Sequence, residues 1–170
     1  MNPDQSPFSV DRVLNEKLAH SFEAQKWTLA IAESCTGGGA SAHLCAQAGV
    51  SSLFLGGIIC YSAEVKKNLL QVPSAILQNQ GAVSEACAKA LASGVKKLLL
   101  SDWAISITGF AGPSGGSATE PVGSVWFAVC GPSFEASINQ RFSGDRNQIQ
   151  NSATRYALQF LLSSVISQSP

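Results

Sequence analysis

The sequence predicts a single α/β domain over residues 1–170, a three-layer α/β/α sandwich around a mixed, mostly parallel sheet of about five strands. Short apolar runs, which suit strands buried on both faces, alternate with segments of helical periodicity. Hydrophobic residues make up 45% and charged residues only 13%, so little of the chain can be disordered. A length of 170 residues matches one ordinary domain, and we expect an ordered core over about 10–166.

The first four elements follow from local patterns. Apolar residues at steps of three and four predict a helix over 10–25. The almost wholly apolar run 27–32 predicts a central strand, and it stops at a glycine-rich turn. After the turn, 40–47 predicts a helix and 53–61 a second strand, in which Gly56-Gly57 suggests a bulge or a close approach of another segment.

The second part of the chain predicts further helices and strands. Two helices, three strands and a final helix are expected over 62–70, 83–98, 104–108, 123–130, 134–142 and 145–166. Ser84 is a candidate cap for the second helix, and Ser143 or Asp145 for the last. Ligands of such sheets bind outside the carboxyl ends of parallel strands, so the glycine-rich loops after Ala32 and after Thr108 should border one crevice.

The charge balance argues against nucleic-acid and membrane partners. Eleven Lys and Arg residues offset eleven Asp and Glu residues, so no general field draws the chain to nucleic acid or anionic lipid. The N-terminal residues lack the pattern of a signal peptide, and no stretch approaches ~18 uninterrupted apolar residues. We therefore expect a cytoplasmic protein that binds neither nucleic acid nor membrane.

The cysteines and histidines limit the chemistry further. Five cysteines stand at wide spacings without a Cys/His cluster, which predicts neither a disulfide scaffold nor a zinc site. His20 and His43 lie far apart in sequence, so a Ser-His-Asp triad is not indicated. A hydrolase of this composition would use a base other than histidine.

Residues 33–39, Glu-Ser-Cys-Thr-Gly-Gly-Gly, form a hydroxyl-rich turn that leads into a helix. Free backbone amides and the positive end of the helix dipole suit phosphate or a developing oxyanion there. Ser34 stands where a turn serine could act as a nucleophile. In the alternative interpretation, Ser34 or Thr36 only caps the helix and the glycines permit tight packing.

Residues 61–67, Tyr-Ser-Ala-Glu-Val-Lys-Lys, lie where the second strand meets its helix. Ser62 and Lys66 are four residues apart and face the same way on that helix. A serine hydroxyl needs a base to attack a carbonyl, and a lysine kept neutral by burial can serve. The alternative is an ordinary surface lysine, which is far commoner.

Residues 108–117, Thr-Gly-Phe-Ala-Gly-Pro-Ser-Gly-Gly-Ser, form a third candidate segment. Small residues at this density let backbone amides approach a ligand closely, although a flexible surface loop is the alternative. The segment is neither a Walker P-loop nor a Rossmann loop, because no Gly-Lys-Ser/Thr and no GxGxxG with a following helix are present. Farther along, Arg146 is unfavourable against the dipole of its helix, which favours a bound anion, whereas capping alone explains Asp145.

Together these segments resemble the C-terminal domain of the competence-damage-inducible protein CinA, including its stand-alone nicotinamide-nucleotide amidases. The resemblance covers about residues 10–165. The matching stretches, in order, are AESCTGG at 32–38, YS..VK within 61–66, GAVSE at 81–85, SITGFAGPSGGS and EPVGSVWFA within 106–128, and FSGDR at 142–146.

The resemblance implies an enzyme that hydrolyses the carboxamide of nicotinamide mononucleotide to nicotinate mononucleotide and ammonia, in pyridine-nucleotide salvage. It implies no metal, no cofactor and a homo-oligomer. By family motif, Ser34 is the nucleophile, with Lys66 and Tyr61 as proton shuttle. Also by family motif, Thr108, Gly109 and Arg146 belong to the substrate site. On physical grounds we add the loop amides of Thr36, Gly37 and Gly38 as donors for the oxyanion. Gly115 and Gly116, together with Arg146, are candidates for the phosphate.

One departure from the family pattern bears on activity. The family usually carries Asn after Tyr-Ser, whereas this chain has Ala63. If that amide orients the substrate or the lysine, its loss can cost ~100-fold or more in rate. A second hypothesis is therefore a catalytically weakened paralogue that binds a pyridine nucleotide as a sensor or subunit. The larger N-terminal domain of full-length members, and its chemistry, are not expected.

Overall fold

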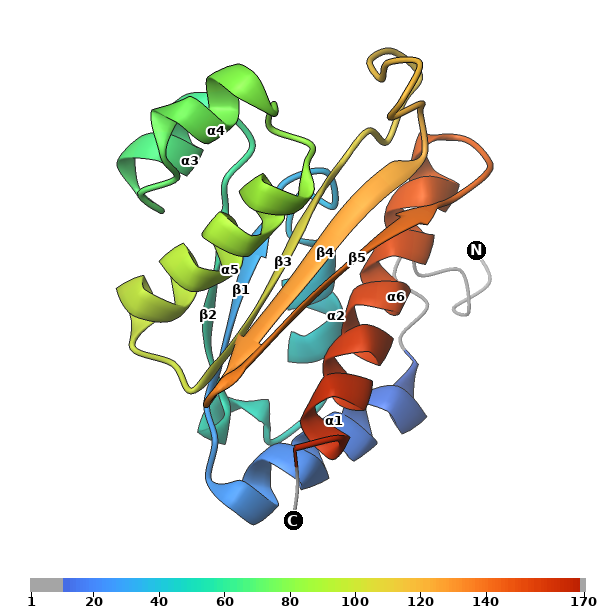
Figure 1. The fold of residues 1–170 in the computed structure, drawn as a ribbon. Coiled ribbons are helices and arrows are strands. Elements are labelled where there is room, and N and C mark those ends of the chain that lie inside the picture. The colour runs from blue at the N-terminus through green and yellow to red at the C-terminus, as the bar shows by residue number, and fades with distance from the viewer. Residues whose placement is uncertain (1–10, 169–170) are drawn as a thin grey trace.

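A computed structural model describes residues 11–168 of the chain. A five-stranded sheet of order β2-β1-β3-β4-β5 forms the middle layer, with helices on both faces (Figure 1). The strands are β1 (Leu29–Glu33), β2 (Phe54–Ile59), β3 (Trp103–Gly109), β4 (Ser124–Gly131) and β5 (Phe134–Arg141). The predicted three-layer α/β/α sandwich is confirmed.

The sheet is mixed, as expected, but it is parallel only in part. Strand β1 lies parallel to both β2 and β3, whereas β3 and β4, and β4 and β5, pair antiparallel. The physical reason is the connections: helices cross over between the parallel strands, while β4 and β5 form a tight hairpin that can join only antiparallel strands. The description "mostly parallel" therefore fits only the half of the sheet that contains β2, β1 and β3.

Each face of the sheet has its own helices and its own core. One face carries α1 (Arg12–Gln25), α2 (Gly39–Cys45) and α6 (Arg146–Ile166). The other carries α3 (Ala63–Asn68), α4 (Ser74–Asn79) and α5 (Glu85–Leu99). The strands β1 and β3 in the middle are almost fully buried, which explains their near-continuous apolar sequences.

Several predicted boundaries are confirmed and others shift. Ser84 caps α5, and Asp145, not Ser143, caps α6 in a capping box with Gln148. Residue 10, where the first helix was predicted to start, lies outside the described residues. The short helix α4 had no counterpart in the sequence prediction, because its six residues, of which Ile76 and Leu77 pack against the core, are too few to display a helical period.

Near Gly56-Gly57 the structure contains both features that the sequence suggested, a bulge and a close approach of another segment. The register of β2 against β1 slips by one residue at Leu55, which makes a bulge. Gly57 lies so close to α2 that a Cβ at this position would collide with the hydroxyl of Ser41. Between residues 11 and 168, no helix is both long and apolar enough to cross a membrane.

The fold brings the loops of interest together. Because β2, β1 and β3 are parallel, their carboxyl ends lie at the same edge of the sheet. The turn 34–38 leaves β1 there, Cys60 and Tyr61 leave β2, and the long loop 110–123 leaves β3 and projects beyond the sheet (Figure 1).

Candidate active site

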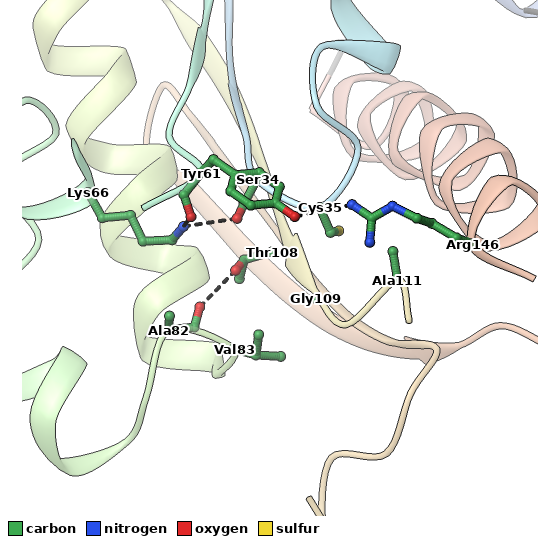
Figure 2. Close-up of a pocket in the computed structure, with 10 residues that line it drawn as sticks. All are labelled: Ser34, Cys35, Tyr61, Lys66, Ala82, Val83, Thr108, Gly109, Ala111 and Arg146. Atoms are coloured by element: carbon green, nitrogen blue, oxygen red, sulfur yellow. Dashed lines mark hydrogen bonds between the residues drawn. The ribbon is translucent and has the colours of Figure 1, made fainter. Parts of the chain in front are cut away.

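A pocket of about 190 Å³ lies at this edge of the sheet (Figure 2). Its walls come from the turn after β1, the residues after β2, the end of β3 and the starts of α5 and α6. It is lined by Ser34, Cys35, Tyr61, Lys66, Ala82, Val83, Thr108, Gly109, Ala111 and Arg146. Six of the eleven residues predicted for the site are therefore in one pocket: Ser34, Tyr61, Lys66, Thr108, Gly109 and Arg146.

The central contact of the pocket joins Ser34 and Lys66, which are 32 residues apart in the chain. The Lys66 Nζ donates a 2.9 Å hydrogen bond to the Ser34 Oγ. The backbone of Ser34 is anchored to the sheet, because its amide donates to the carbonyl of Ile107 on β3 at 2.9 Å. A hydroxyl and an amine are thus fixed against each other at the floor of the pocket.

Lys66 is buried, with only 1% of its surface exposed. The surface-lysine interpretation is therefore wrong. Besides Ser34, its Nζ donates to the backbone carbonyls of Cys60 and, at 3.4 Å, Tyr61. These carbonyls are accessible because β2 ends at Ile59 instead of continuing to residue 61. The Lys66 side chain therefore extends from α3, past the residues that follow β2, to Ser34 at the end of β1.

Ser62, the residue that shares a helix face with Lys66, is not its partner. The Ser62 hydroxyl caps α3 and accepts a 3.2 Å hydrogen bond from the amide of Val65. The serine beside the lysine is instead Ser34, from the turn after β1. Helical spacing therefore pointed to the correct lysine but to the wrong serine.

Cys35 lines the pocket next to Ser34, so its thiol must be weighed as a rival nucleophile. Burial raises the pKa of this thiol to about 12, and the negative charge of Glu33 adds to the effect. A thiol with that pKa stays protonated near neutral pH and offers almost no thiolate. The hydroxyl of Ser34, with an amine beside it, is the better placed nucleophile.

Arg146 lies across the pocket from Lys66 (Figure 2). It is an exposed residue in the first turn of α6, and its guanidinium is held by neutral oxygens. Its Nη1 donates to the carbonyl of Gly112 at 2.7 Å and its Nη2 to the hydroxyl of Tyr61 at 3.1 Å. Since no carboxylate pairs with it among the described residues, Arg146 remains available to an anion.

The pocket wall between Lys66 and Arg146 contains some residues that the sequence analysis predicted and others that it did not. The hydroxyl of Thr108 donates to the carbonyl of Ala82 at 2.7 Å. Gly109 lies against β4, where a Cβ would stand 2.6 Å from the Ser124 carbonyl oxygen. Ala82 and Val83 were missed, although they belong to the matching stretch 81–85, which was the available signal.

Three residues predicted to bind substrate do not line the pocket: Thr36, Gly37 and Gly38. The Thr36 hydroxyl and the Gly38 amide instead donate to the buried carboxylate of Glu33, at 2.7 and 3.1 Å, and the Gly37 amide donates to the Ser34 carbonyl at 3.2 Å. The interpretation that Ser34 or Thr36 caps α2 is also wrong. The N-cap position is Gly38, and the capping carboxylate is that of Glu33, which the sequence pattern did not single out.

Gly115 and Gly116 also lie away from the pocket, in the exposed part of the loop after β3. The base of that loop is tied down by Glu120, which accepts from the Trp126 Nε1 at 3.0 Å and from the Asn139 Nδ2 at 3.3 Å. These bonds hold the loop against β4 and β5, on the side of the sheet away from β1. The surface-loop interpretation therefore fits this part of the segment.

Ala63, where the family usually carries Asn, does not line the Ser34 pocket. It is exposed on α3 and lines a separate hollow of about 130 Å³. The other residues of that hollow are Glu64, Lys67, Ser74, Leu77 and Gln78. In the part of the chain that the structure describes, no group of three His, Cys, Asp or Glu side chains is arranged to hold a metal ion.

Comparison with curated proteins links this chain to longer relatives. A CinA-like protein of Synechococcus sp. (strain RCC307) is 48% identical over 136 residues, which are 80% of this chain and 32% of that protein. A CinA-like protein of Thermotoga neapolitana is 41% identical over 154 residues, 89% of this chain and 37% of that protein. The chain therefore spans about a third of the length of these curated relatives.

Solved structures match over nearly their whole length. The competence damage-inducible protein A (ComA) from Klebsiella pneumoniae subsp. pneumoniae has a TM-score of 0.89 at 38% identity, covering 93% of this chain and 98% of that chain. The competence/damage inducible protein CihA from Agrobacterium tumefaciens has a TM-score of 0.87 at 30% identity, covering 96% and 98%. The family model of the CinA C-terminal domain matches residues 11–165. This chain belongs to the CinA C-terminal domain family.

Proposed function

We propose that this chain is an amidohydrolase that converts nicotinamide mononucleotide to nicotinate mononucleotide and ammonia, as the sequence resemblance implies. The observation that carries the proposal is the 2.9 Å hydrogen bond between the Lys66 Nζ and the Ser34 Oγ at the floor of the pocket. Amide hydrolysis needs a nucleophile, a base that can later return the proton to the leaving nitrogen, and donors for the oxyanion.

In the proposed first step, Lys66 acts as the base: its Nζ keeps its bonds to the carbonyls of Cys60 and Tyr61 and accepts from the Ser34 hydroxyl instead of donating to it. The Ser34 hydroxyl donates its proton to the Lys66 Nζ as its Oγ attacks the carboxamide carbon. The tetrahedral intermediate then collapses, the carbon–nitrogen bond breaks, and the ammonium of Lys66 returns the proton to the leaving nitrogen. Ammonia departs and leaves an ester on Ser34.

In the second step Lys66 repeats its part, with water as the nucleophile and Ser34 as the leaving group. A water molecule gives a proton to Lys66 and attacks the ester carbon, and the carbon–oxygen bond to Ser34 breaks. Lys66 returns its proton to the Ser34 Oγ, and the acid product leaves. For both oxyanions we propose the backbone amide of Thr36, two residues after the nucleophile, because the Gly38 amide is already bonded to Glu33. Within the described residues the Thr36 amide has no hydrogen-bond partner.

For the phosphate of the substrate we propose Arg146. A guanidinium prefers a doubly charged phosphate to the neutral hydroxyl of Tyr61 that it holds in this structure. A phosphate on Arg146 would release the Tyr61 hydroxyl, which could then turn toward the leaving nitrogen and share in the proton transfer. Gly115 and Gly116 have no part in this proposal, because they lie in the exposed loop outside the pocket.

The competing hypothesis of a weakened paralogue loses its main support. It rested on Ala63, and this residue lies in a hollow outside the Ser34 pocket. The contact between Ser34 and Lys66 is intact despite the alanine. We therefore retain the amidase as the single proposed function.

The test is ammonia release from nicotinamide mononucleotide by the purified wild type and the Ser34→Ala variant, with ligand-induced thermal shifts measured on both. We expect turnover by the wild type only and a similar thermal shift in both proteins. A wild type that binds the nucleotide without releasing ammonia would contradict the proposal. Equal turnover by the variant would rule out Ser34 as the nucleophile.

A further inference from the structure

The carboxylate of Glu33, directly before Ser34, is fully buried at the end of β1. It accepts five hydrogen bonds from the turn after β1 and the start of α2. Its Oε2 accepts from the Thr36 Oγ1 at 2.7 Å, the Gly38 amide at 3.1 Å and the Ala40 amide at 3.0 Å. Its Oε1 accepts from the Ser41 amide at 2.8 Å and the Ser41 Oγ at 2.6 Å. No cation pairs with it among residues 11–168.

Burial of a carboxylate at the start of a helix has a high desolvation free energy. Taking the charge out of water is unfavourable unless hydrogen bonds replace its hydration. An Asp or Ser at the N-cap would satisfy the first amides of α2 locally, yet that position is Gly38 and has no side chain. The cap comes from five residues upstream, so the same side chain ties the end of β1 to the start of α2.

This tie fixes the turn at both ends. The backbone of Glu33 is locked in the sheet, where its carbonyl accepts from the Cys60 amide at 2.7 Å. Its side chain holds residues 36, 38, 40 and 41. Ser34 lies between these anchors, and its own amide is bonded to β3. The nucleophile therefore has little freedom to move away from Lys66.

We propose that Glu33 is a positioning residue, whose carboxylate fixes the turn 34–38 so that the Ser34 Oγ stays in contact with the Lys66 Nζ. The inference rests on the proposed function. Glu33 itself does not line the pocket, so it acts through Ser34 and not on the substrate. Its loss should therefore lower kcat much more than it changes the KM for nicotinamide mononucleotide.

The principal variant is Glu33→Gln, which keeps the shape of the side chain. One amide oxygen can still accept from Thr36, Gly38 and Ala40, but the amide nitrogen cannot accept from the Ser41 amide. We expect kcat to fall by about 10- to 100-fold, the effect of a small misplacement of a reacting group. The KM should stay within about threefold, because the groups that line the pocket are unchanged.

Asp102→Asn is the matched control at the other end of the same strand. The Asp102 carboxylate accepts from the amide and the hydroxyl of Thr28, both at 2.8 Å, just before β1. This control neutralises a carboxylate that anchors the start of β1 far from the pocket, so it should leave kcat unchanged, whatever its effect on the melting temperature. A loss of kcat in the control as large as in Glu33→Gln would mean that general destabilisation explains both, and would overturn the proposal.

Two milder variants keep the test decisive if Glu33→Gln does not fold. Thr36→Val and Ser41→Ala each remove one side-chain donor to Glu33 and leave the carboxylate in place. Each should lower kcat by several-fold, again with little change in KM. Folded variants that all retain the wild-type kcat would show that Glu33 serves folding alone.

A substrate-independent measurement separates this inference from the proposed function. The rate at which a fluorophosphonate labels Ser34, followed by mass spectrometry, reports the nucleophile without the nucleotide. If the wild type releases no ammonia but is labelled, and the Glu33 variants are labelled about 10-fold more slowly, the positioning role holds and the substrate assignment fails. Equal labelling of wild type and variants would overturn the positioning role, and a wild type that neither turns over nor is labelled would overturn both.

Discussion

The hydroxyl of Tyr61 contacts Arg146, not Lys66. It accepts a 3.1 Å hydrogen bond from the Arg146 Nη2, whereas Lys66 reaches only the backbone carbonyl of Tyr61, at 3.4 Å. The two residues are 85 positions apart in the chain, and both line the pocket (Figure 2). An anion that bound the Arg146 Nη2 would therefore compete with the Tyr61 hydroxyl for the same donor group.

Arg146→Met should weaken binding of a phosphorylated substrate. A hydrogen bond to a charged group contributes about 1.5–3 kcal/mol, so the KM for nicotinamide mononucleotide should rise by about 10- to 100-fold. The KM for nicotinamide riboside, which lacks the phosphate, should change little. The matched control is Arg155→Met on the same helix, where the arginine pairs with Asp11 away from the pocket. Equal losses for both substrates would contradict the phosphate assignment.

Lys66→Met should nearly abolish turnover and preserve binding. The methionine fills the buried space of the lysine stem but cannot accept the proton of Ser34, so kcat should fall by about 100- to 10,000-fold. Steady-state kinetics and the thermal shift with nicotinamide mononucleotide measure the two effects separately. Lys67→Met, at the exposed neighbouring position on α3, is the control and should behave as wild type. A wild-type rate in Lys66→Met would exclude the lysine as base.

Ala63→Asn should have almost no effect on the rate. Position 63 lines the hollow beside Lys67 and Ser74, outside the Ser34 pocket, so a new amide there should change kcat by less than about twofold. Ammonia release by the two proteins under the same conditions is the measurement. A tenfold gain in the variant would instead restore the hypothesis of a weakened paralogue.

The thiol of Cys35 should resist alkylation in the native protein. Its pKa is raised to about 12 by burial, so the reactive thiolate form becomes significant only well above neutral pH. Cys45 is exposed, whereas the other four cysteines are buried. At pH 8, brief treatment with iodoacetamide should therefore add a single label at Cys45 and leave activity intact, as read by mass spectrometry and ammonia release. Rapid labelling of Cys35 with loss of activity would contradict the assigned pKa direction.

Local sequence patterns were sufficient for most of the fold. The apolar runs that form β1 and β3 are buried on both faces. Ser84 and Asp145, two of the residues predicted as helix caps, are the N-caps of α5 and α6. These features depend on neighbours within a few residues, which a single sequence displays directly. The helix α4 escaped detection because its six residues are too few to display a helical period.

The candidate site could be predicted as a set of residues but not as a geometry. Ser34, Lys66 and Arg146 were identified from loop composition and from the resemblance to a family. The sequence linked Lys66 to Ser62 by helical spacing, whereas the folded chain pairs it with Ser34 from the turn after β1. Glu33 was predicted only as the first residue of the turn after the strand, and only the fold, which brings the start of α2 back toward it, gives its carboxylate five donors.

The sequence by itself thus determined the layers, the strands and the residue types available for chemistry, because periodicity and capping act over short distances along the chain. The tertiary structure decided which residues meet. In the folded chain the amides at the start of α2 donate to Glu33. Gly115, Gly116 and Ala63 lie outside the Ser34 pocket. The expected homo-oligomer stays a prediction, since an interface is a property of two chains. Contacts between distant segments depend on how the sheet orders its strands, and no local pattern encodes that order.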